Sequence, residues 1–246
     1  MINLSVIIPT YNESKRLPKT LMNVVSYLQE KEVRSEIIIS DGGSTDGTVD
    51  FVEKYQKDSL IEIKIIKDRR REGKGWGVKK GMLAADGNWI LFMDADGSTS
   101  ISQLIKLEKY KDEYDVIIGS RYAGIEADVK QNLIRRAVSK LGGYIIRIIT
   151  GLDIRDTQCG FKLFSHQSSR DIFGNLQTRG WGFDVEVLLL ARKFDYRIKE
   201  VPVKWRDSEG SHLRAGQDSI KAFFEILRAR KNIEKKFRFN EKITKN

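Results

Sequence analysis

The stretch Trp89-Ile-Leu-Phe-Met-Asp-Ala-Asp-Gly-Ser-Thr99 decides the fold of this 246-residue chain. Its apolar part, Trp89 to Met93, predicts a strand that is buried on both faces, as strands of parallel sheets are. Asp94 and Asp96 follow directly, at the carboxyl end where open α/β sheets place their ligand crevices. Two carboxylates there can hold a hard divalent cation and, through it, a diphosphate. A plain turn is the alternative, because Asp, Gly and Ser favour turns.

Predicted strands and helices alternate on both sides of this stretch. Short β-branched runs predict strands, and apolar residues at helical spacing predict helices. We expect strands at 4–9, 36–40, 61–66, 89–93, 115–119 and 200–205, and helices at 17–30, 48–55, 78–85, 132–150 and 218–232. This order predicts an α/β fold, in which a mostly parallel central sheet is flanked by helices on both faces.

The composition favours a globular protein with an anionic partner. Hydrophobic residues make up 40% of the chain and there are only 3 prolines, which argues against long linkers or disorder. The net charge of +10 indicates an anionic partner, which is a phosphorylated substrate, a membrane surface or nucleic acid. The alternative is that the charge only keeps the protein soluble. We expect no nucleic-acid partner, because no known RNA- or DNA-reading motif is present.

The single cysteine, Cys159, excludes an internal disulfide and fits a reducing compartment. We expect it to be a small buried hydrophobic residue rather than a nucleophile. The first five residues carry no charged segment, and no apolar stretch reaches about 18 residues. We therefore expect neither a signal peptide nor a membrane-spanning helix.

The loops after the first and third strands do not match known phosphate-binding loops. A dinucleotide-binding fold needs three spaced glycines after its first strand, but Pro9-Thr-Tyr-Asn-Glu13 has none. Gly73-Lys-Gly-Trp-Gly77, which follows the arginines at 69–71, matches no P-loop spacing. Its charges either neutralise a diphosphate or are simply solvated. Since parallel strands present these loops on one rim of the sheet, we expect them to converge on one ligand.

Three motifs together resemble the inverting glycosyltransferases of family 2, which have the GT-A fold. They are Pro9-Thr-Tyr-Asn-Glu13, Ser40-Asp-Gly-Gly-Ser-Thr-Asp-Gly47 and Asp94-Ala-Asp96, in this order. One departure is Gly42, where the family usually has a second Asp. The second half resembles the polyprenyl-phosphate branch, most of all the dolichyl-phosphate β-glucosyltransferases. The segments that carry this likeness are Gly119-Ser-Arg121, Arg135 with Ser139, Arg155-Asp-Thr-Gln-Cys-Gly-Phe-Lys-Leu-Phe164 and Trp181-Gly-Phe-Asp-Val-Glu186.

The resemblance implies a site for a nucleotide sugar, a divalent metal and a lipid phosphate. Donor-binding residues would be Pro9, Tyr11, Glu13, Asp41, Lys74, Asp94, Ala95, Asp96, Gln158 and Arg206. Asp94 and Asp96 would bind Mg²⁺ or Mn²⁺ and, with Arg121, would be the catalytic residues. The acceptor phosphate would be held by Arg121, Arg135 and Ser139, because arginine makes bidentate phosphate contacts.

The implied reaction moves glucose, or a similar hexose, from a UDP-sugar to dolichyl or another polyprenyl phosphate. Such an acceptor is already anionic, so it needs no general base. The alternatives are a GDP-mannose donor or another family 2 acceptor.

The basic amphipathic segment 132–150 and the basic tail from Arg228 are expected to touch a membrane surface. A helix packed on the sheet and a frayed end are the alternatives. The implied location is peripheral, on the cytoplasmic membrane face. We expect residues 1–215 to form the GT-A domain and 216–246 a C-terminal helix with a basic tail.

Several other polar residues are candidates for the site. The segment Asp156-Thr-Gln158 is expected to orient the hydroxyls of the donor sugar. Asp184 and Glu186 alternate with apolar residues, so they lie either on the wet face of a strand or helix start, or in the site. The segment 206–214 resembles the family's loop near the diphosphate, with Ser211 and His212 as further candidate contacts.

Overall fold

The computed structural model describes residues 1–68, 72–123, 129–130, 133–206 and 217–243. Side chains are described for 1–68, 72–123, 142–206 and 221–237.

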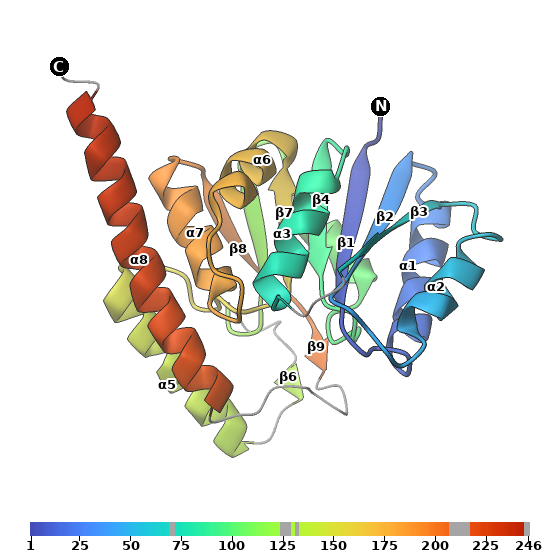
Figure 1. Ribbon diagram of the computed structural model, residues 1–246, viewed down its shortest axis with the longest axis horizontal. Helices are drawn as coiled ribbons and strands as arrows, with labels where there is room; N and C mark the ends of the chain where they lie inside the picture. The colour runs from blue at the N-terminus through green and yellow to red at the C-terminus, as the bar shows by residue number, and fades with distance from the viewer. Residues whose placement is uncertain (69–71, 124–128, 131–132, 207–216, 244–246) are drawn as a thin grey trace.

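A seven-stranded sheet forms the centre of the molecule, with the strand order β3-β2-β1-β4-β7-β5-β8 (Figure 1). Only β7 runs antiparallel to its neighbours β4 and β5, and all other pairs in this sheet are parallel. The strands are β1 Leu4–Thr10, β2 Ser35–Asp41, β3 Glu62–Lys67, β4 Trp89–Met93, β5 Val116–Ser120, β7 Phe161–Ser165 and β8 Ile198–Pro202. The expected mostly parallel sheet is confirmed, whereas β7 was not predicted.

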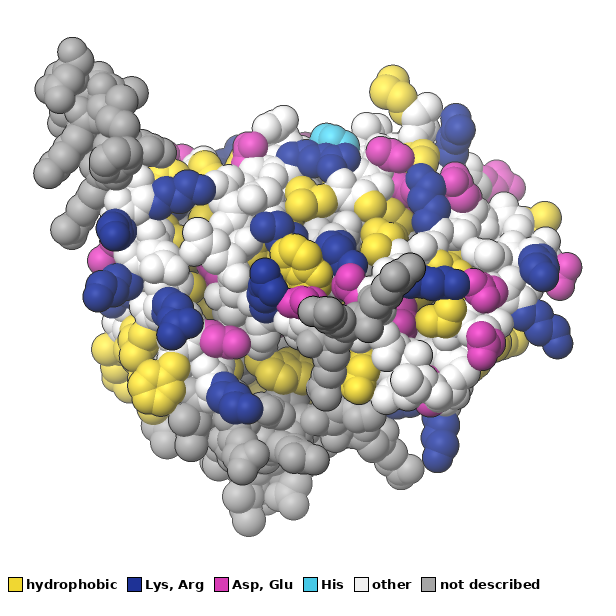
Figure 2. Space-filling model, viewed as in Figure 1, with side chains coloured by type: hydrophobic (Ala, Val, Ile, Leu, Met, Phe, Trp, Pro, Cys, Tyr) yellow, Lys and Arg dark blue, Asp and Glu magenta, His cyan; other side chains and the backbone are white. Residues whose placement is uncertain are grey.

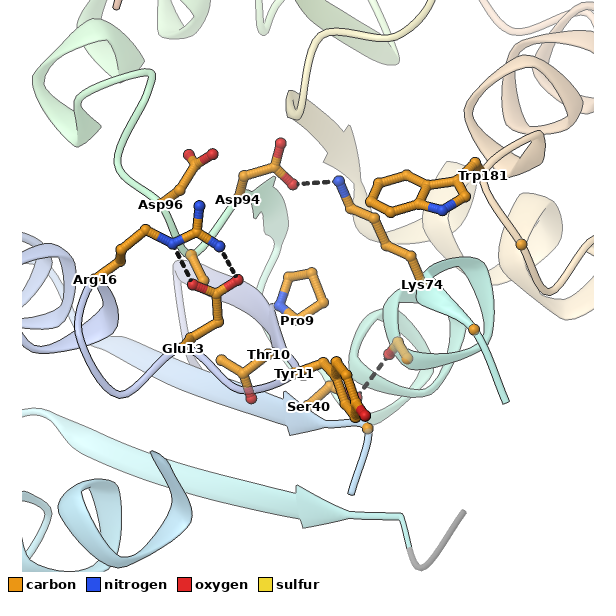
Figure 3. Close-up of a pocket in the computed structure, with 15 residues that line it drawn as sticks. Pro9, Thr10, Tyr11, Glu13, Arg16, Ser40, Lys74, Asp94, Asp96 and Trp181 are labelled. Carbon is orange, nitrogen blue, oxygen red and sulfur yellow. Dashed lines mark hydrogen bonds and ion pairs between the residues drawn. The ribbon is translucent and has the colours of Figure 1, made fainter. Parts of the chain in front are cut away.

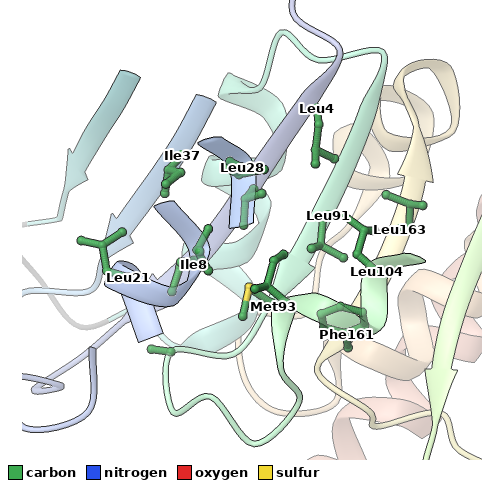
Figure 4. Packing of buried hydrophobic residues seen from close by; sticks show 14 of the residues in the cluster. Leu4, Ile8, Leu21, Leu28, Ile37, Leu91, Met93, Leu104, Phe161 and Leu163 are labelled. Carbon is green, nitrogen blue, oxygen red and sulfur yellow. The ribbon is translucent and has the colours of Figure 1, made fainter. Parts of the chain in front are cut away.

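Helices cover both faces of this sheet, because neighbouring strand residues point to opposite sides. On β4, for example, Leu91 and Met93 join one core cluster, while Ile90 and Phe92 join the other. The first cluster lies under α1, α2, η1 and α4, and the second under α3, α6 and α7. Figure 4 shows part of the first cluster, in which Leu21 and Leu28 of α1 and Leu104 of α4 meet residues of the sheet. These helices are α1 Leu17–Glu30, α2 Thr48–Tyr55, α3 Lys74–Ala84, η1 Ile101–Gln103, α4 Leu104–Glu108, α6 His166–Asn175 and α7 Phe183–Lys193.

Two longer helices, α5 (Leu133–Thr150) and α8 (Gln217–Ile243), lie side by side at the β8 side of the sheet (Figure 1). Arg192 of α7 donates to the carbonyls of Thr150 and Gly151, and Arg230 of α8 donates to that of Ile149. Because the last carbonyls of a helix lack partners within it, these arginines cap α5 and tie it to α7 and α8. None of the helices in the described ranges is long and apolar enough to cross a lipid bilayer.

Three predicted boundaries were wrong. The glycine-rich segment 73–77 was expected to be a loop, but α3 begins at Lys74. Gly75 and Gly77 are buried there, so these glycines allow close packing rather than a flexible loop. The predicted strand 200–205 is divided between β8 and the short β9 (Trp205–Arg206), which pairs with β6 (Val129–Lys130). The last helix continues to Ile243, well beyond the expected end at 232, so the described part of the basic tail is helical.

Candidate active site

A pocket opens at the carboxyl ends of β1, β2 and β4, on the rim where the sequence predicted it (Figure 3). It brings together seven of the expected donor-binding residues from three separate segments: Pro9, Tyr11, Glu13, Lys74, Asp94, Ala95 and Asp96. Thr10, Ser40 and Trp181 also line it; they lie in the quoted motifs, but no site role was predicted for them. Arg16, which the sequence did not single out, lines it too, and Gly42, Gly73, Gly77 and Gly180 complete the lining. The convergence of the strand-end loops is therefore observed, and the role of each residue stays a prediction.

Lys74 and Asp94 form an ion pair inside this pocket. The Lys74 Nζ lies 2.6 Å from Asp94 Oδ1 and 5.1 Å from the centre of the Trp181 ring (Figure 3). Burial opposes the charge on Lys74, but the carboxylates of Asp94 and Asp184 outweigh it and raise its pKa. Burial raises the pKa of Asp94, with Lys74 acting in the opposite direction. An entering diphosphate or metal ion would have to rearrange this pair.

Gly160 makes room for the Asp94 carboxylate. The Asp94 N–H donates to the Gly160 carbonyl at 3.0 Å, across the antiparallel pair of β4 and β7. A Cβ atom added at Gly160 would lie 1.9 Å from Asp94 Oδ2, far closer than two such atoms can approach. The position of Asp94 therefore depends on a residue without a side chain. The only signal for this role in the sequence is the place of Gly160 in the 155–164 motif.

Asp96 lies in a tight turn at the mouth of the pocket. Its Oδ1 accepts from the Ser98 N–H at 2.9 Å, and Gly97 has a φ of +67°, which favours glycine. The Arg206 N–H donates to the Ser98 carbonyl at 2.9 Å, which places β9 beside this turn. The side chain of Arg206 is exposed and does not line the pocket.

The donor atoms at this mouth fit a magnesium or manganese ion. Asp94 and Asp96 offer carboxylate oxygens, which hard divalent cations prefer. Within the described residues, no group of three or more acidic, histidine or cysteine side chains forms a complete cage. A cation held by these two carboxylates would therefore take further ligands from a diphosphate and from water, as Mg²⁺ commonly does.

Glu13 is held by Arg16 in the same pocket wall. Arg16 Nε and one terminal nitrogen donate to the two carboxylate oxygens at 2.7 and 2.6 Å (Figure 3). The Glu13 N–H donates to Thr48 Oγ1 at 2.8 Å, which fixes the loop against the start of α2. The spacing of three residues between acid and base, across the turn that leads into α1, is the signal that would have found Arg16.

Asp41 is buried beneath the pocket and does not line it. Its Oδ1 accepts from Thr10 Oγ1 at 2.9 Å, and its Oδ2 accepts from the N–H groups of Gly43 and Ser44 at 2.9 and 2.8 Å. These bonds shape the loop after β2. The predicted bond from Asp41 to a nucleotide base stays a prediction.

Arg121 forms a bidentate pair with Asp156 rather than lining the pocket. The two nitrogen–oxygen distances are 2.8 and 2.9 Å, and the guanidinium carbon lies 5.5 Å from the centre of the Trp205 ring. Although burial opposes it, the Arg121 charge lowers the pKa of Asp156. Gln158 is exposed and also lies outside the pocket lining. The side chains of Arg135 and Ser139, and residues Ser211 and His212, lie outside the described residues.

Asp184 and Glu186 are not on a wet face, which corrects one of the two expectations for them. Both are in the first turn of α7 and both are buried. Asp184 pairs with the buried Lys162 of β7 at 2.5 Å, and Glu186 accepts from the N–H groups of Gln177 and Thr178 at 2.9 and 2.7 Å. A buried charge needs such partners, so burial and pairing come together here.

The expectation for Cys159 is confirmed. Its thiol is buried, and burial raises its pKa to about 12. The thiolate form is therefore scarce at neutral pH, which excludes easy nucleophilic chemistry.

Comparisons with known proteins identify the family of this chain. The family model for "Glycosyl transferase family 2" matches residues 5–173. The chain is 36% identical over 242 residues to a dolichyl-phosphate beta-glucosyltransferase of Dictyostelium discoideum, covering 93% of this chain and 74% of that protein. It is 38% identical over 246 residues to the Saccharomyces cerevisiae protein of the same name, covering 92% and 73%. The human protein of that name is 35% identical over 227 residues, covering 85% and 69%.

Solved structures show the same fold. Glucosyl-3-phosphoglycerate synthase from Mycobacterium tuberculosis, in complex with Mn²⁺, UDP-glucose and phosphoglyceric acid, superimposes with a TM-score of 0.69. The match covers 93% of this chain and 80% of that one, at 18% sequence identity. At this identity the likeness establishes the GT-A-like architecture alone.

Proposed function

Since this chain belongs to glycosyl transferase family 2, we propose that it transfers glucose from UDP-glucose to dolichyl phosphate, with inversion at the anomeric carbon. The observation that carries the proposal is the convergence of Lys74, Asp94 and Asp96 on one pocket at the carboxyl rim of the sheet. The names of the relatives supply the sugar and the lipid carrier. A β-linked product is what inversion of an α-linked UDP-glucose gives.

In the proposed reaction, a phosphate oxygen of the acceptor attacks the anomeric carbon as the bond to the diphosphate breaks. The protein then has to orient two anions and to reduce their repulsion. In this proposal Lys74 contacts the diphosphate once its pair with Asp94 opens, and Tyr11 and Glu13 contact the nucleoside; that all three line one pocket supports these roles. A cation bound by Asp94 and Asp96 would stabilise the departing diphosphate as a Lewis acid.

We favour a UDP-sugar over GDP-mannose. The relatives bear the name of glucosyltransferases, and the structural neighbour was solved with UDP-glucose and Mn²⁺. The choice between Mg²⁺ and Mn²⁺ is left to the assay. Arg121, Arg135 and Ser139 stay the proposed contacts for the acceptor phosphate.

We further propose that α5 and α8 rest on a membrane surface, where a lipid acceptor would be found. Figure 2 shows hydrophobic side chains over α5 and α8, at the left of the view, beside Lys and Arg side chains. The exposed large hydrophobic residues there are Tyr144, Ile145, Ile148, Phe224 and Leu227. Arg147, Lys221 and Arg228 lie on the same two helices and reach solvent. An apolar face flanked by positive charge suits the interface of an anionic membrane.

The proposed location is the cytoplasmic face of the membrane, and the free thiol of Cys159 fits the reducing conditions there. We also propose residues 1–215 as the catalytic domain and 216–246 as the C-terminal helix and tail that contact the surface.

A transfer assay tests the reaction. The protein is incubated with dolichyl phosphate, Mg²⁺ or Mn²⁺, and labelled UDP-glucose or GDP-mannose, and label is counted in the organic phase. We expect metal-dependent label from UDP-glucose, lost in Asp96→Ala and retained in Asp58→Asn, an exposed acid away from the pocket. Label from GDP-mannose alone would replace the proposed donor. If no label is transferred although UDP-glucose still binds, dolichyl phosphate is not the acceptor. The proposed acceptor contacts Arg121, Arg135 and Ser139 would then be refuted as well.

Vesicle flotation tests the surface. We expect binding to vesicles with anionic lipid, weakened by Ile148→Ser with Phe224→Ser. Leu60→Ser is the matched control, because Leu60 is 86% exposed and lies next to β3, at the edge of the sheet opposite β8. Equal loss in the control, or retention of binding in the double variant, would refute the α5–α8 surface. Binding to RNA in place of vesicles would indicate a nucleic-acid partner.

A further inference from the structure

We propose that Glu225 of α8 is a positioning residue for the pocket, because it holds the loop that carries Trp181 against Lys74. The proposal deepens the function proposed above and rests on it for the identity of the donor. Glu225 does not line the pocket, so it would act through the 177–182 loop.

The loop is shaped to receive this carboxylate. Glu225 Oε2 accepts from the Gly182 N–H at 2.8 Å. A Cβ atom added at Gly180 would lie 2.1 Å from Glu225 Oε1, and one added at Gly182 would lie 2.8 Å from Glu225 Cβ. The two glycines that flank Trp181 therefore leave the space that Glu225 occupies.

Trp181 thus stands between two carboxylate anchors. On the earlier side, the buried Glu186 accepts from the N–H groups of Gln177 and Thr178. On the later side, the Gly182 carbonyl accepts from the N–H groups of Val185 and Glu186 in α7, and the Gly182 N–H donates to Glu225 of a different helix. Removal of Glu225 would leave the Gly182 N–H, next to Trp181, without this carboxylate partner.

The loop in turn supports the start of α3. The Trp76 N–H donates to the Arg179 carbonyl at 3.2 Å. A Cβ atom at Gly73 would lie 2.3 Å from the same carbonyl oxygen, so the two segments are in close contact. Lys74, between these contacts, faces the Trp181 ring and pairs with Asp94. A shift of the loop would therefore displace Lys74, the residue that is proposed to contact the diphosphate.

Our main test compares Glu225→Ala and Glu225→Gln with Glu234→Ala. Glutamine has nearly the same shape and keeps an oxygen that accepts a hydrogen bond, so it should rescue the contact. Glu234 lies on the same helix and pairs with Arg230, so its loss is a matched control. We expect Glu225→Ala to raise the KM for UDP-glucose about tenfold, the scale of losing one hydrogen bond to a charged group. The KM for dolichyl phosphate, and both constants in Glu225→Gln and Glu234→Ala, should stay within about threefold of wild type.

A second measurement needs neither substrate nor turnover. The emission of Trp181 is obtained as the difference between each protein and its Trp181→Phe counterpart. We expect Glu225→Ala to shift this emission to longer wavelength, with Glu225→Gln near wild type. Gly180→Ala should give the same shift, because its methyl group would push away the same carboxylate.

The outcomes separate this proposal from the proposed function. An unchanged Trp181 emission in Glu225→Ala, or an equal KM change in Glu234→Ala, would overturn the positioning role. Loss of thermal stability in Glu225→Ala without rescue by Glu225→Gln would make the residue merely structural. Failure of the wild type to transfer label, with the Trp181 shift present, would refute the reaction and leave the positioning role standing.

Discussion

Two lysine–aspartate pairs lie close to the Phe92 ring, and they differ in exposure. Lys74 and Asp94 have side chains that are 22% and 31% exposed, and they face the pocket. Lys162 and Asp184 are only 1% and 6% exposed, and they lie in the core beneath it. Both ammonium groups lie within 6 Å of the centre of the Phe92 ring. The difference indicates that a ligand can rearrange the first pair, whereas the second pair holds the fold.

The most direct test of this difference between the two pairs replaces each aspartate by asparagine, Asp94 in one variant and Asp184 in another. For Asp94→Asn we expect transfer to fall about 10³-fold, the scale of losing one group that stabilises transition-state charge. The free energy of unfolding should change by less than about 1 kcal/mol, since the pair is partly exposed. Label transfer and urea unfolding measure the two effects. A stability loss as large as that of Asp184→Asn would erase the distinction.

For Asp184→Asn we expect the free energy of unfolding to fall by about 3–5 kcal/mol, because the buried Lys162 charge loses its partner. The double variant Lys162→Met with Asp184→Leu should regain most of this loss, since it removes both buried charges. Urea unfolding checks both values. A double variant as unstable as the single one would show that packing, rather than charge, is what Asp184 supplies.

A smaller effect on transfer is expected at Gly160, which packs against the Asp94 carboxylate. Gly160→Ala should lower transfer about 10²-fold, as expected when a reacting group moves by about 1 Å, because the new methyl group meets Asp94. Gly174→Ala is the matched control: it lies in α6, and its added Cβ would meet nothing within 4 Å. Similar activity in the two variants would mean that Asp94 tolerates displacement.

The ion pair of Arg121 and Asp156 predicts how the stability of the protein depends on pH. Arg121 lowers the pKa of Asp156 below its ordinary value, so the ionised carboxylate stabilises the folded state. This contribution is complete above the unfolded pKa of about 3.9 and is lost as the pH falls below it. We expect the stability difference between wild type and Asp156→Asn, measured by urea unfolding, to narrow below about pH 4. A difference that widens on acidification would reverse the assigned sign.

The smallest expected effect is that of a thiol reagent. With its pKa raised to about 12, Cys159 should stay unmodified at pH 8 in the native protein and react once the protein is unfolded in urea. Counting modified thiols by mass spectrometry checks this. Rapid modification of the native protein, with activity lost, would place Cys159 in an open part of the site.

The sequence predicted the residues at the rim of the pocket better than the residues that hold them in place. Asp94, Asp96 and Tyr11 follow short apolar strands, and strand-end loops of a parallel sheet meet on one edge, so their convergence was predictable. Gly160, Trp181 and Glu225 act through close contacts between segments distant in the chain, and no local pattern reports such contacts. Lys162 was missed because a lysine inside an apolar run looks exposed until its partner, Asp184, is known.

The position of β7 has a consequence for the order of folding during synthesis. The first four strands of the chain pair in parallel, but β4 ends at Met93 while its outer partner β7 begins at Phe161. Until the ribosome has delivered that later strand, β4 is an unpaired edge with an apolar sequence. Such edges invite pairing with other chains. A chain that stops before β7 should therefore aggregate, whereas one that includes β7 should shield this edge.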